Sequence, residues 1–239
     1  MTEERPRRPK DAAPEGPTPG APASEPPAPG DLAPGDSDER RTAPGRIGGL
    51  VLAAGASSRL GSPKADIDLD GRSALARVLD VLREAGVHGG VVVLAPDAQP
   101  PAVDLGSFRL VTNPDPAAGR TGSIQAGLAA TGGNLVLWPV DRPLAARSTV
   151  EALLGAASDP EADWIVPFHE GRGHPVLLRA RLRVPILTAL PDADLRSVLS
   201  TAGTRRLAVP VDDPFIHANL DTLEGAATWI GRWREAGSP

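Results

Sequence analysis

The sequence predicts an α/β domain with a doubly wound, mostly parallel sheet, preceded by a disordered tail. Two observations lead to this prediction. Short apolar runs alternate with stretches whose apolar residues recur at helical spacing, so that four strand-to-helix passages follow one another. Glycine-rich and charged stretches stand directly after several of the apolar runs, and this is where an open α/β sheet binds its ligands.

Residues 1–46 differ in composition from the rest of the chain. They are rich in proline, alanine and glycine, they carry charges of both signs, and they contain no aromatic residue. Such a stretch buries too little apolar surface to offset the chain entropy that folding removes. We therefore predict a disordered tail over residues 1–46 and one folded domain over residues 47–236, which is long enough for a single core.

The overall composition excludes several classes of function. A formal net charge of -5 argues against a general nucleic-acid surface. The sequence has no cysteine, which excludes disulfides, thiolate metal sites and cysteine nucleophiles and is typical of a cytoplasmic protein. No apolar stretch has the length of a signal-peptide core or of a membrane span. We expect a cytoplasmic protein whose partners are neither nucleic acids nor membranes.

The opening of the domain predicts a strand, a helix and a second strand. Residues 48–54 and 90–95 are short aliphatic runs of the kind found in strands that are covered on both faces. Between them, residues 74–85 have apolar positions at helical spacing, with Ser73 placed to cap the helix and Gly86 to end it. This order favours a parallel sheet.

The rest of the domain continues the alternation. Further strands are expected at residues 108–111, 134–138, 164–168, 174–178 and 207–211, with a hairpin joining the third and fourth of these. Short helices are expected after Gly122 and at residues 194–199. Another helix should start near Thr149, because Ser148 and Glu151 have the form of a capping box. The last helix is expected to carry a helical stripe at Leu223, Ala227, Ile230 and either Trp233 or Arg234.

One stretch, residues 52–64 with the sequence LAAGASSRLGSPK, combines the features of a phosphate site. Its glycines let a ligand approach the backbone closely, its serines add hydroxyls and exposed amides, and its two cations supply positive charge. These residues are Gly55, Gly61, Ser57, Ser58, Arg59 and Lys64. The stretch follows the first predicted strand. It therefore predicts a site for the phosphates of a nucleotide.

Two better-known phosphate loops do not fit this stretch. A Walker loop needs G-x-x-x-x-G-K-[ST], whereas here the glycines are one position further apart and the lysine stands three residues after the second glycine. The dinucleotide fingerprint G-x-G-x-x-G is also absent. The stretch instead resembles the L-A-[AG]-G-x-S-x-R-[MLF]-G-x-x-K signature of the MobA-like nucleotidyltransferases, which include the molybdenum cofactor cytidylyl- and guanylyltransferases. The matching residues are Leu52, Ala53, Ala54, Gly55, Ser57, Arg59, Leu60, Gly61 and Lys64.

The resemblance implies a nucleotide-diphospho-sugar transferase-like fold and a reaction. In that reaction a nucleoside monophosphate passes from an NTP to a phosphorylated acceptor, with Mg²⁺ as cofactor and pyrophosphate as the second product. The Ala53-Ala54-Gly55 form of the loop favours CTP, with molybdopterin as the acceptor. A sugar-phosphate nucleotidyltransferase is the nearest alternative, and a catalytically silent nucleotide-binding accessory protein is the second. A molybdoenzyme partner and the oligomeric state stay open.

Two aspartates resemble ion ligands of the same family. Asp141, in PVDRP, follows the predicted strand at residues 134–138 and is similar to the family's D-x-P element, while Asp221, in NLDT, is similar to its [ND]-x-[DN]-T element. The resemblance implies that both hold Mg²⁺, an ion that prefers carboxylate oxygens. Without the family, Asp141 is a turn or cap residue, and Asp221 or Thr222 is the N-cap of the last helix.

The resemblance also implies roles for the other site residues. Arg59, Lys64 and Asp141 would act in catalysis. Nucleotide binding would involve Leu52, Ala53, Ala54, Gly55, Ser57, Ser58, Arg59, Lys64, Asn113, Ser123 and Gly127. Ser123 and Gly127 match G-x-x-x-S-[IL]-x-x-G, but they are equally a helix-start hydroxyl and a close-packing glycine. Asn113 is equally a turn residue before proline. His174, in GHP, would face the acceptor, although a lone histidine is more often structural.

Two positions depart from the family pattern. Asp66 stands where apolar residues usually follow the lysine, so it either faces solvent or weakens the positive field at the phosphates. Leu195 replaces the glycine of a D-x-G-x-R element, which leaves the acceptor contacts open. Both departures bear on whether the chain turns over or only binds a nucleotide.

Overall fold

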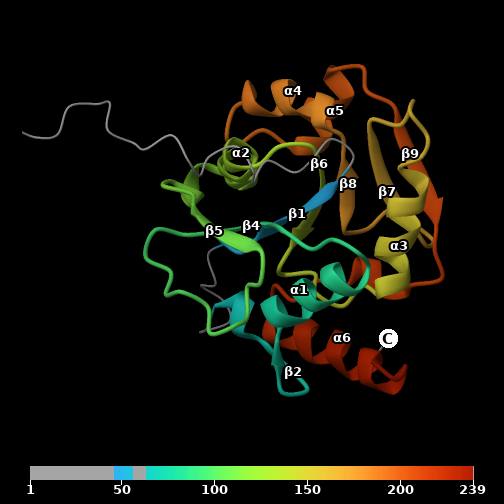
Figure 1. Ribbon diagram of the computed structural model, residues 1–239. Helices are drawn as coiled ribbons and strands as arrows, with labels where there is room; N and C mark the ends of the chain where they lie inside the picture. The colour runs from blue at the N-terminus through green and yellow to red at the C-terminus, as the bar shows by residue number, and fades with distance from the viewer. Residues whose placement is uncertain (1–45, 56–62, 239) are drawn as a thin grey trace, which may run out of the picture. The chain divides into compact units, whose positions relative to one another are not determined.

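The computed structural model describes residues 46–55 and 63–238, and seven of its strands form one sheet (Figure 1). In spatial order these strands are β5 (Phe108–Thr112), β4 (Gly90–Leu94), β1 (Ile47–Leu52), β6 (Asn134–Pro139), β8 (Val176–Leu178), β7 (Trp164–Phe168) and β9 (Arg206–Pro210). β8 runs antiparallel to both of its neighbours, whereas the other neighbouring pairs are parallel. The predicted mostly parallel sheet and the predicted hairpin are confirmed.

The order of the strands fixes where a ligand can bind. From β1 the chain adds β4 and then β5 on one side, and it returns to place β6 on the other side. The direction of winding therefore reverses between β1 and β6, where Leu52 is in register with Pro139. Open α/β sheets bind ligands beyond the carboxyl ends of the strands at such a reversal. The residues that follow these two strands leave the sheet at that edge.

Helices cover both faces of the sheet (Figure 1). One face carries α1 (Ala74–Glu84), α3 (Arg147–Ala156) and α6 (Leu223–Glu235), and the other carries α2 (Arg120–Ala130), α4 (Arg183–Leu187) and α5 (Leu195–Thr201). Side chains of a strand alternate between the faces, so Val51 packs in the first core and Leu50 in the second. Both side chains are fully buried. Two cores separated by the sheet are the arrangement that the predicted doubly wound fold requires.

Short elements complete the fold. They are η1 (Lys64–Asp66), β2 (Asp68–Leu69), β3 (Arg72–Ser73), η2 (Pro116–Ala118), η3 (Ala180–Leu182) and η4 (Pro214–His217). β2 and β3 pair as a separate antiparallel hairpin before α1. As predicted, Ser73 caps α1 by accepting a hydrogen bond from the Ala76 amide at 3.2 Å, and Gly86 follows the helix with φ +96°.

The predicted capping box of α3 was wrong. The helix begins at Arg147, one residue before Ser148, and its N-cap is Ala146, whose side chain makes no capping hydrogen bond. A buried carboxylate from a distant segment replaces the local cap. Asp213 Oδ2 accepts hydrogen bonds from the Ala146 amide at 2.8 Å and from Thr149 Oγ1 at 2.6 Å. Because the donor groups at a helix start need acceptors from any source, a local motif cannot reveal this partner.

The predicted apolar stripe of α6 is confirmed in its second half and wrong in its first half. Leu223 is 67% exposed and Ala227 is also exposed, whereas Ala226 and Trp233 are buried in the first core and Ile230 packs against it. Ile230 and Trp233 thus lie on the face that packs on the core, as predicted, whereas Ala226 takes the place expected for Ala227. No helix in the part of the chain that the structure describes has both the length and the apolar character to cross a bilayer.

Candidate active site

The end of β1 leads into the predicted phosphate stretch at the strand reversal. The ladder continues past the strand, because the Ala53 amide donates to the Val93 carbonyl at 2.8 Å and the Val140 amide donates to the Leu52 carbonyl at 2.9 Å. Ala54 is buried, and Gly55 is exposed. The predicted residues Ser57, Ser58, Arg59, Leu60 and Gly61 lie outside the described residues. The described part resumes at Pro63, directly before η1, whose first residue is Lys64.

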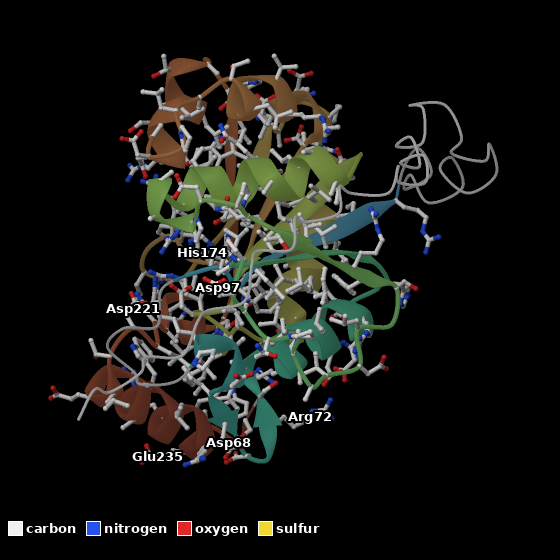
Figure 2. The ribbon with its side chains drawn as sticks, turned by 90° about the vertical axis from the view of Figure 1, so that its left-hand side faces the viewer. Asp68, Arg72, Asp97, His174, Asp221 and Glu235 are labelled. Carbon is white, nitrogen blue, oxygen red and sulfur yellow. The ribbon has the colours of Figure 1, made fainter. Side chains whose placement is uncertain are left out.

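Lys64 joins the two predicted metal ligands. Its ammonium group donates a hydrogen bond to Asp221 Oδ1 and lies 3.9 Å from Asp141 Oδ2. The three residues come from η1, from the turn after β6 and from the segment before α6. The structure thus brings together three predicted site residues that are far apart in the sequence. Figure 2 labels Asp221 on the same side of the ribbon as His174.

Asp141 is held in a buried position. Its backbone carbonyl accepts a hydrogen bond from the Leu220 amide at 2.8 Å, which ties its segment to the one that carries Asp221. Its side-chain atom Oδ1 is buried with no hydrogen-bond partner among the described residues, while Oδ2 lies 3.6 Å from the Arg120 guanidinium. Burial raises the pKa of Asp141, and the opposing charge of Arg120 does not cancel that effect.

The surroundings of Asp221 shift its pKa in the opposite direction to that of Asp141. Burial pushes its pKa upward, but the hydrogen bonds from Lys64 and from Asn219 Nδ2, the latter at 2.7 Å, outweigh burial and lower the pKa. Asp221 is not the cap of α6. That role belongs to Thr222, whose Oγ1 accepts a hydrogen bond from the Gly225 amide at 3.1 Å. The carboxylate of Asp221 is therefore available for the site.

The oxygen atoms near Asp141 and Asp221 are suitable ligands for a magnesium ion. Buried oxygens without a hydrogen-bond partner in the described part of the chain include Asp141 Oδ1 and Asn219 Oδ1, and the Asp221 carboxylate lies beside the latter residue. Mg²⁺ is typically bound by one or two carboxylates together with substrate phosphates. Within residues 46–55 and 63–238, no three His, Cys, Asp or Glu residues gather closely enough to form a site by themselves. Two carboxylates and one amide oxygen match an ion that shares its coordination with a nucleotide.

Asn113 and Ser123 contact each other beside the strand ends. Asn113 Nδ2 donates to Ser123 Oγ at 2.9 Å, and both side chains are buried. Asn113 Oδ1 also accepts from the Asp115 amide at 3.1 Å, so its turn interpretation is confirmed. Gly127 packs closely, since an added Cβ would lie 2.2 Å from Leu50 Cδ1. The two polar residues hold the first turn of α2 next to the end of β5.

A cleft of about 1030 Å³ opens between the strand ends and the β7–β8 hairpin. Leu52, Arg120 and His174 line it, together with residues from the start of α5. The cleft is also lined by arginines that the sequence motifs did not predict as site residues, although each stands inside or directly beside one of those motifs. These arginines are Arg120, Arg142, Arg172 and Arg196. Neighbouring acidic residues, among them Asp192, make the cleft polar as well as cationic.

His174 has an unusual setting in this cleft. Its Nδ1 atom is buried and has no hydrogen-bond partner among the described residues. Burial, followed by the charges of Arg142 and Arg120, lowers the pKa of His174 to about 3, so the imidazole is neutral at physiological pH. The preceding Gly173 permits this placement, since an added Cβ would lie 2.4 Å from the Ile216 carbonyl oxygen. The GHP motif thus presents a neutral ring to the cleft.

The two departures from the family pattern have simple placements. Asp66 is exposed at the end of η1, in agreement with the interpretation that it faces solvent. Leu195 begins α5 and packs against the second core while it also lines the cleft. Asp194 before it caps α5 by accepting a hydrogen bond from the Ser197 amide at 2.9 Å.

Comparison with known protein families agrees with this geometry. Residues 49–209 match the family model described as the MobA-like NTP transferase domain. The chain belongs to this family. It is therefore a nucleotidyltransferase, and the predicted family and enzyme class are confirmed. The match begins inside β1 and ends inside β9, and it includes Lys64 and Asp141.

Individual relatives support the same assignment. The chain is 33% identical over 202 residues to a molybdenum cofactor guanylyltransferase of Rhodobacter capsulatus, covering 80% of this chain and 98% of the relative. It is 33% identical over 187 residues to a protein of the same name from Rhodopseudomonas palustris (strain BisB5), covering 71% and 87%.

Solved structures share the fold. Rv0371c from Mycobacterium tuberculosis H37Rv matches with a TM-score of 0.67 and 24% identity over 78% of this chain and 98% of that one. A molybdopterin-guanine dinucleotide biosynthesis protein A from Archaeoglobus fulgidus matches with a TM-score of 0.62 and 17% identity over 79% and 100%. These likenesses confirm the predicted nucleotide-diphospho-sugar transferase-like fold.

Proposed function

We propose that this nucleotidyltransferase transfers a nucleoside monophosphate from a magnesium-bound NTP to the phosphate of molybdopterin and releases pyrophosphate. The convergence of Lys64, Asp141 and Asp221 at the strand reversal, beside a cleft lined with arginines, is the observation that carries the proposal. The position agrees with the rule for ligands in open α/β sheets. The residue types suit phosphates and a divalent cation.

The reaction needs no nucleophile from the protein. An oxygen of the acceptor phosphate attacks the α-phosphorus in line, the bond from that phosphorus to the bridging oxygen breaks, and pyrophosphate leaves with the electron pair. Catalysis of this kind consists of positioning and charge neutralisation. Mg²⁺, held by Asp141 and Asp221 with the Asn219 oxygen nearby, would supply Lewis acidity at the phosphate oxygens. Manganese is present in a solved complex of Rv0371c, which shares the fold of this chain.

Lys64 has a second task in this scheme. In the structure its ammonium group neutralises the two carboxylates. When the ion and the nucleotide bind, the positive charge of Lys64 becomes available to the phosphates that it borders. The predicted nucleotide-binding roles of Ser57, Ser58 and Arg59 belong to the same proposal, as do those of Asn113 and Ser123.

The arginines of the cleft support a phosphorylated acceptor. An arginine guanidinium presents a planar fork of donors that matches phosphate oxygens, and several of them converge on this cleft. His174 lines the cleft with a neutral ring, which can form a hydrogen bond to the polar edge of a pterin. Molybdopterin combines a phosphate with such a ring, so both features of the cleft have a counterpart in the acceptor.

The proposal also specifies which nucleotide is the substrate. The Ala53-Ala54-Gly55 form of the first loop favours CTP, whereas the curated relatives described above are named guanylyltransferases. We take GTP as the substrate because the relatives match along most of the chain, while the loop form concerns a single position. CTP is the competing assignment.

Pyrophosphate release with each of the four NTPs, with and without molybdopterin, tests the proposal. The expected result is release that requires Mg²⁺ and molybdopterin and is fastest with GTP. Release with CTP alone would reverse the nucleotide assignment, and release with sugar phosphates in place of molybdopterin would favour the sugar-phosphate alternative. Tight binding of an NTP, seen as a rise in melting temperature, with no pyrophosphate under any condition would identify an accessory binding protein instead.

A further inference from the structure

The turn after β6 holds Asp141 at the site although it lacks regular secondary structure. A buried carbonyl in such a turn needs a donor from elsewhere. The Asp141 carbonyl accepts from the Leu220 amide, and the Arg142 carbonyl accepts from Trp138 Nε1 at 2.8 Å. The residues that follow, Pro143 to Ala146, are all buried.

One side chain from α1 provides the donors for the next three carbonyls. Arg77 donates from Nε to the Pro143 carbonyl at 3.1 Å, and from NH2 to the Leu144 and Ala145 carbonyls at 3.3 and 3.4 Å. A guanidinium suits this task because its donors point in fixed directions from a planar group. Arg77 thus supports consecutive carbonyls that begin two residues after Asp141.

The same guanidinium also contacts α6. Its Cζ atom lies 4.5 Å from the centre of the Trp233 ring, in the geometry of a cation–π contact. α6 follows directly after Asp221 and its cap, Thr222. One side chain therefore contacts both the turn that carries Asp141 and the helix that follows Asp221.

We propose that Arg77 is a positioning residue that fixes the separation and orientation of the Asp141 and Asp221 carboxylates. The inference rests on the proposed function, because it assigns those carboxylates to a divalent ion. Arg77 does not contact the reacting groups in this scheme. It acts through the turn and through α6, as residues behind a metal ligand commonly do.

The chain offers a matched control in Arg179. This half-buried arginine also donates to three backbone carbonyls, those of Ala157, Asp159 and Ala162. These carbonyls belong to the loop before β7, at the amino ends of the parallel strands and thus at the opposite edge of the sheet from Asp141. Removing its donors disturbs a comparable hydrogen-bond network far from the carboxylates.

The experiment compares R77M with R179M, since methionine keeps an unbranched apolar stem and removes the donors. Mn²⁺ is titrated into each folded protein without nucleotide, and the free ion is followed by electron paramagnetic resonance. D141N defines the site under study. We expect R77M to bind Mn²⁺ about tenfold to a hundredfold more weakly than the unaltered chain, as for other residues behind metal ligands, and R179M to bind it within about twofold.

Melting temperatures separate positioning from general loosening. We expect R77M and R179M both to have lower melting temperatures than the unaltered chain. We expect R77K to bind Mn²⁺ more tightly than R77M but less tightly than the unaltered chain, because lysine can still donate to carbonyls. Equal Mn²⁺ affinities in R77M and R179M would overturn the inference while leaving the proposed function intact. If the unaltered chain binds no Mn²⁺, or binds Mn²⁺ as tightly as D141N does, the metal assignment itself is overturned, and the role of Arg77 with it. If R77M does not fold, R77K is the deciding variant, because lysine lacks the planar guanidinium. A Mn²⁺ affinity of R77K equal to that of the unaltered chain would then overturn the inference.

Discussion

The segment after β6 and the segment before α6 each bring one aspartate to the same lysine, but they treat its charge in opposite ways. Asp141 is buried, and one of its carboxylate oxygens lacks a partner in the described part of the chain. Asp221 is more exposed and accepts hydrogen bonds from both Lys64 and Asn219. The first carboxylate is costly to keep charged and the second is stabilised as an anion, as their opposite pKa shifts indicate.

Because of this difference, Asp141 and Asp221 should contribute unequally to the binding of the ion. A buried, under-coordinated carboxylate gains most from a divalent cation, because the cation compensates for the hydration that the carboxylate has lost. A carboxylate that already has two donors gains less. We therefore expect Asp141 to dominate the binding of the ion and Asp221 to assist it.

The largest expected effect is that of Asp141→Asn on turnover. A bound metal ion contributes several kcal/mol of transition-state charge stabilisation, so the loss of its main ligand should lower kcat by about 10³ or more. Pyrophosphate release measures this. Asp163→Asn is the control, because Asp163 accepts hydrogen bonds from Arg181 and Arg205 and does not line the cleft. Equal activities of the two variants would contradict the role of Asp141.

Lys64→Ala should follow, with a fall in turnover of about 10², the effect of removing one transition-state donor. Arg72→Ala is a suitable control, since that cation pairs with Asp80 at an exposed position. Turnover that stays unchanged in the lysine variant would remove Lys64 from the catalytic group and leave it as a structural counter-ion.

Replacing His174 should have a smaller and more selective effect. His174→Gln is expected to raise the KM for the acceptor about tenfold, the usual value of one hydrogen bond, and to leave the KM for the NTP unchanged. Because burial lowers the pKa of His174 to about 3, the imidazole does not titrate between pH 5 and 9. The pH profile of the variant should therefore match that of the unaltered chain. A lost inflection near neutral pH would disprove the neutral-ring interpretation.

The pH dependence of Mn²⁺ binding also tests whether Asp141 or Asp221 dominates the binding of the ion. Since burial raises the pKa of Asp141, protons compete with a divalent ion at a higher pH than for an ordinary aspartate. Mn²⁺ affinity without nucleotide should accordingly fall on acidification before ordinary aspartates titrate. A pH dependence that begins only below the usual aspartate range would show that Asp221 dominates.

The smallest expected effects concern stability, and they have opposite signs. For Asp141 the folded-state pKa is raised, so its contribution to stability is lost as the pH rises through that value, and Asp141→Asn should raise the melting temperature at pH 7. For Asp221 the folded-state pKa is lowered, so its contribution is present above the unfolded pKa and is lost as the pH falls through the folded value. Asp221→Asn should lower the melting temperature slightly, because the side chain is 37% exposed. Shifts of the same sign would contradict the comparison.

Much of this site could be predicted from local sequence. Residues 48–54 were recognisable as a buried strand from their composition, and Lys64 as a phosphate-site cation from its place in the glycine-rich stretch after that strand. These features depend on neighbours within a few positions. The family resemblance extended the prediction to Asp141 and Asp221, which are distant from the first loop in the sequence but each belong to a short motif.

The features that escaped prediction depend on contacts between distant segments. Asp213 caps α3 from another element, so the local Ser148 signal was misleading. Arg77 supports the turn after Asp141 through contacts that no spacing rule describes. The face of α6 was misjudged at Leu223 because packing against α1 and the sheet, and not periodicity alone, selects which residues are buried.

Diffraction from crystals grown with Mn²⁺ and GTP tests the central claim most directly, since the anomalous signal of manganese locates the ion independently of any functional assay. We expect a manganese peak bonded to carboxylate oxygens of Asp141 and Asp221, with the α-phosphate of the nucleotide on the other side of the ion. A peak that is bonded to neither aspartate, next to a bound nucleotide, would contradict it.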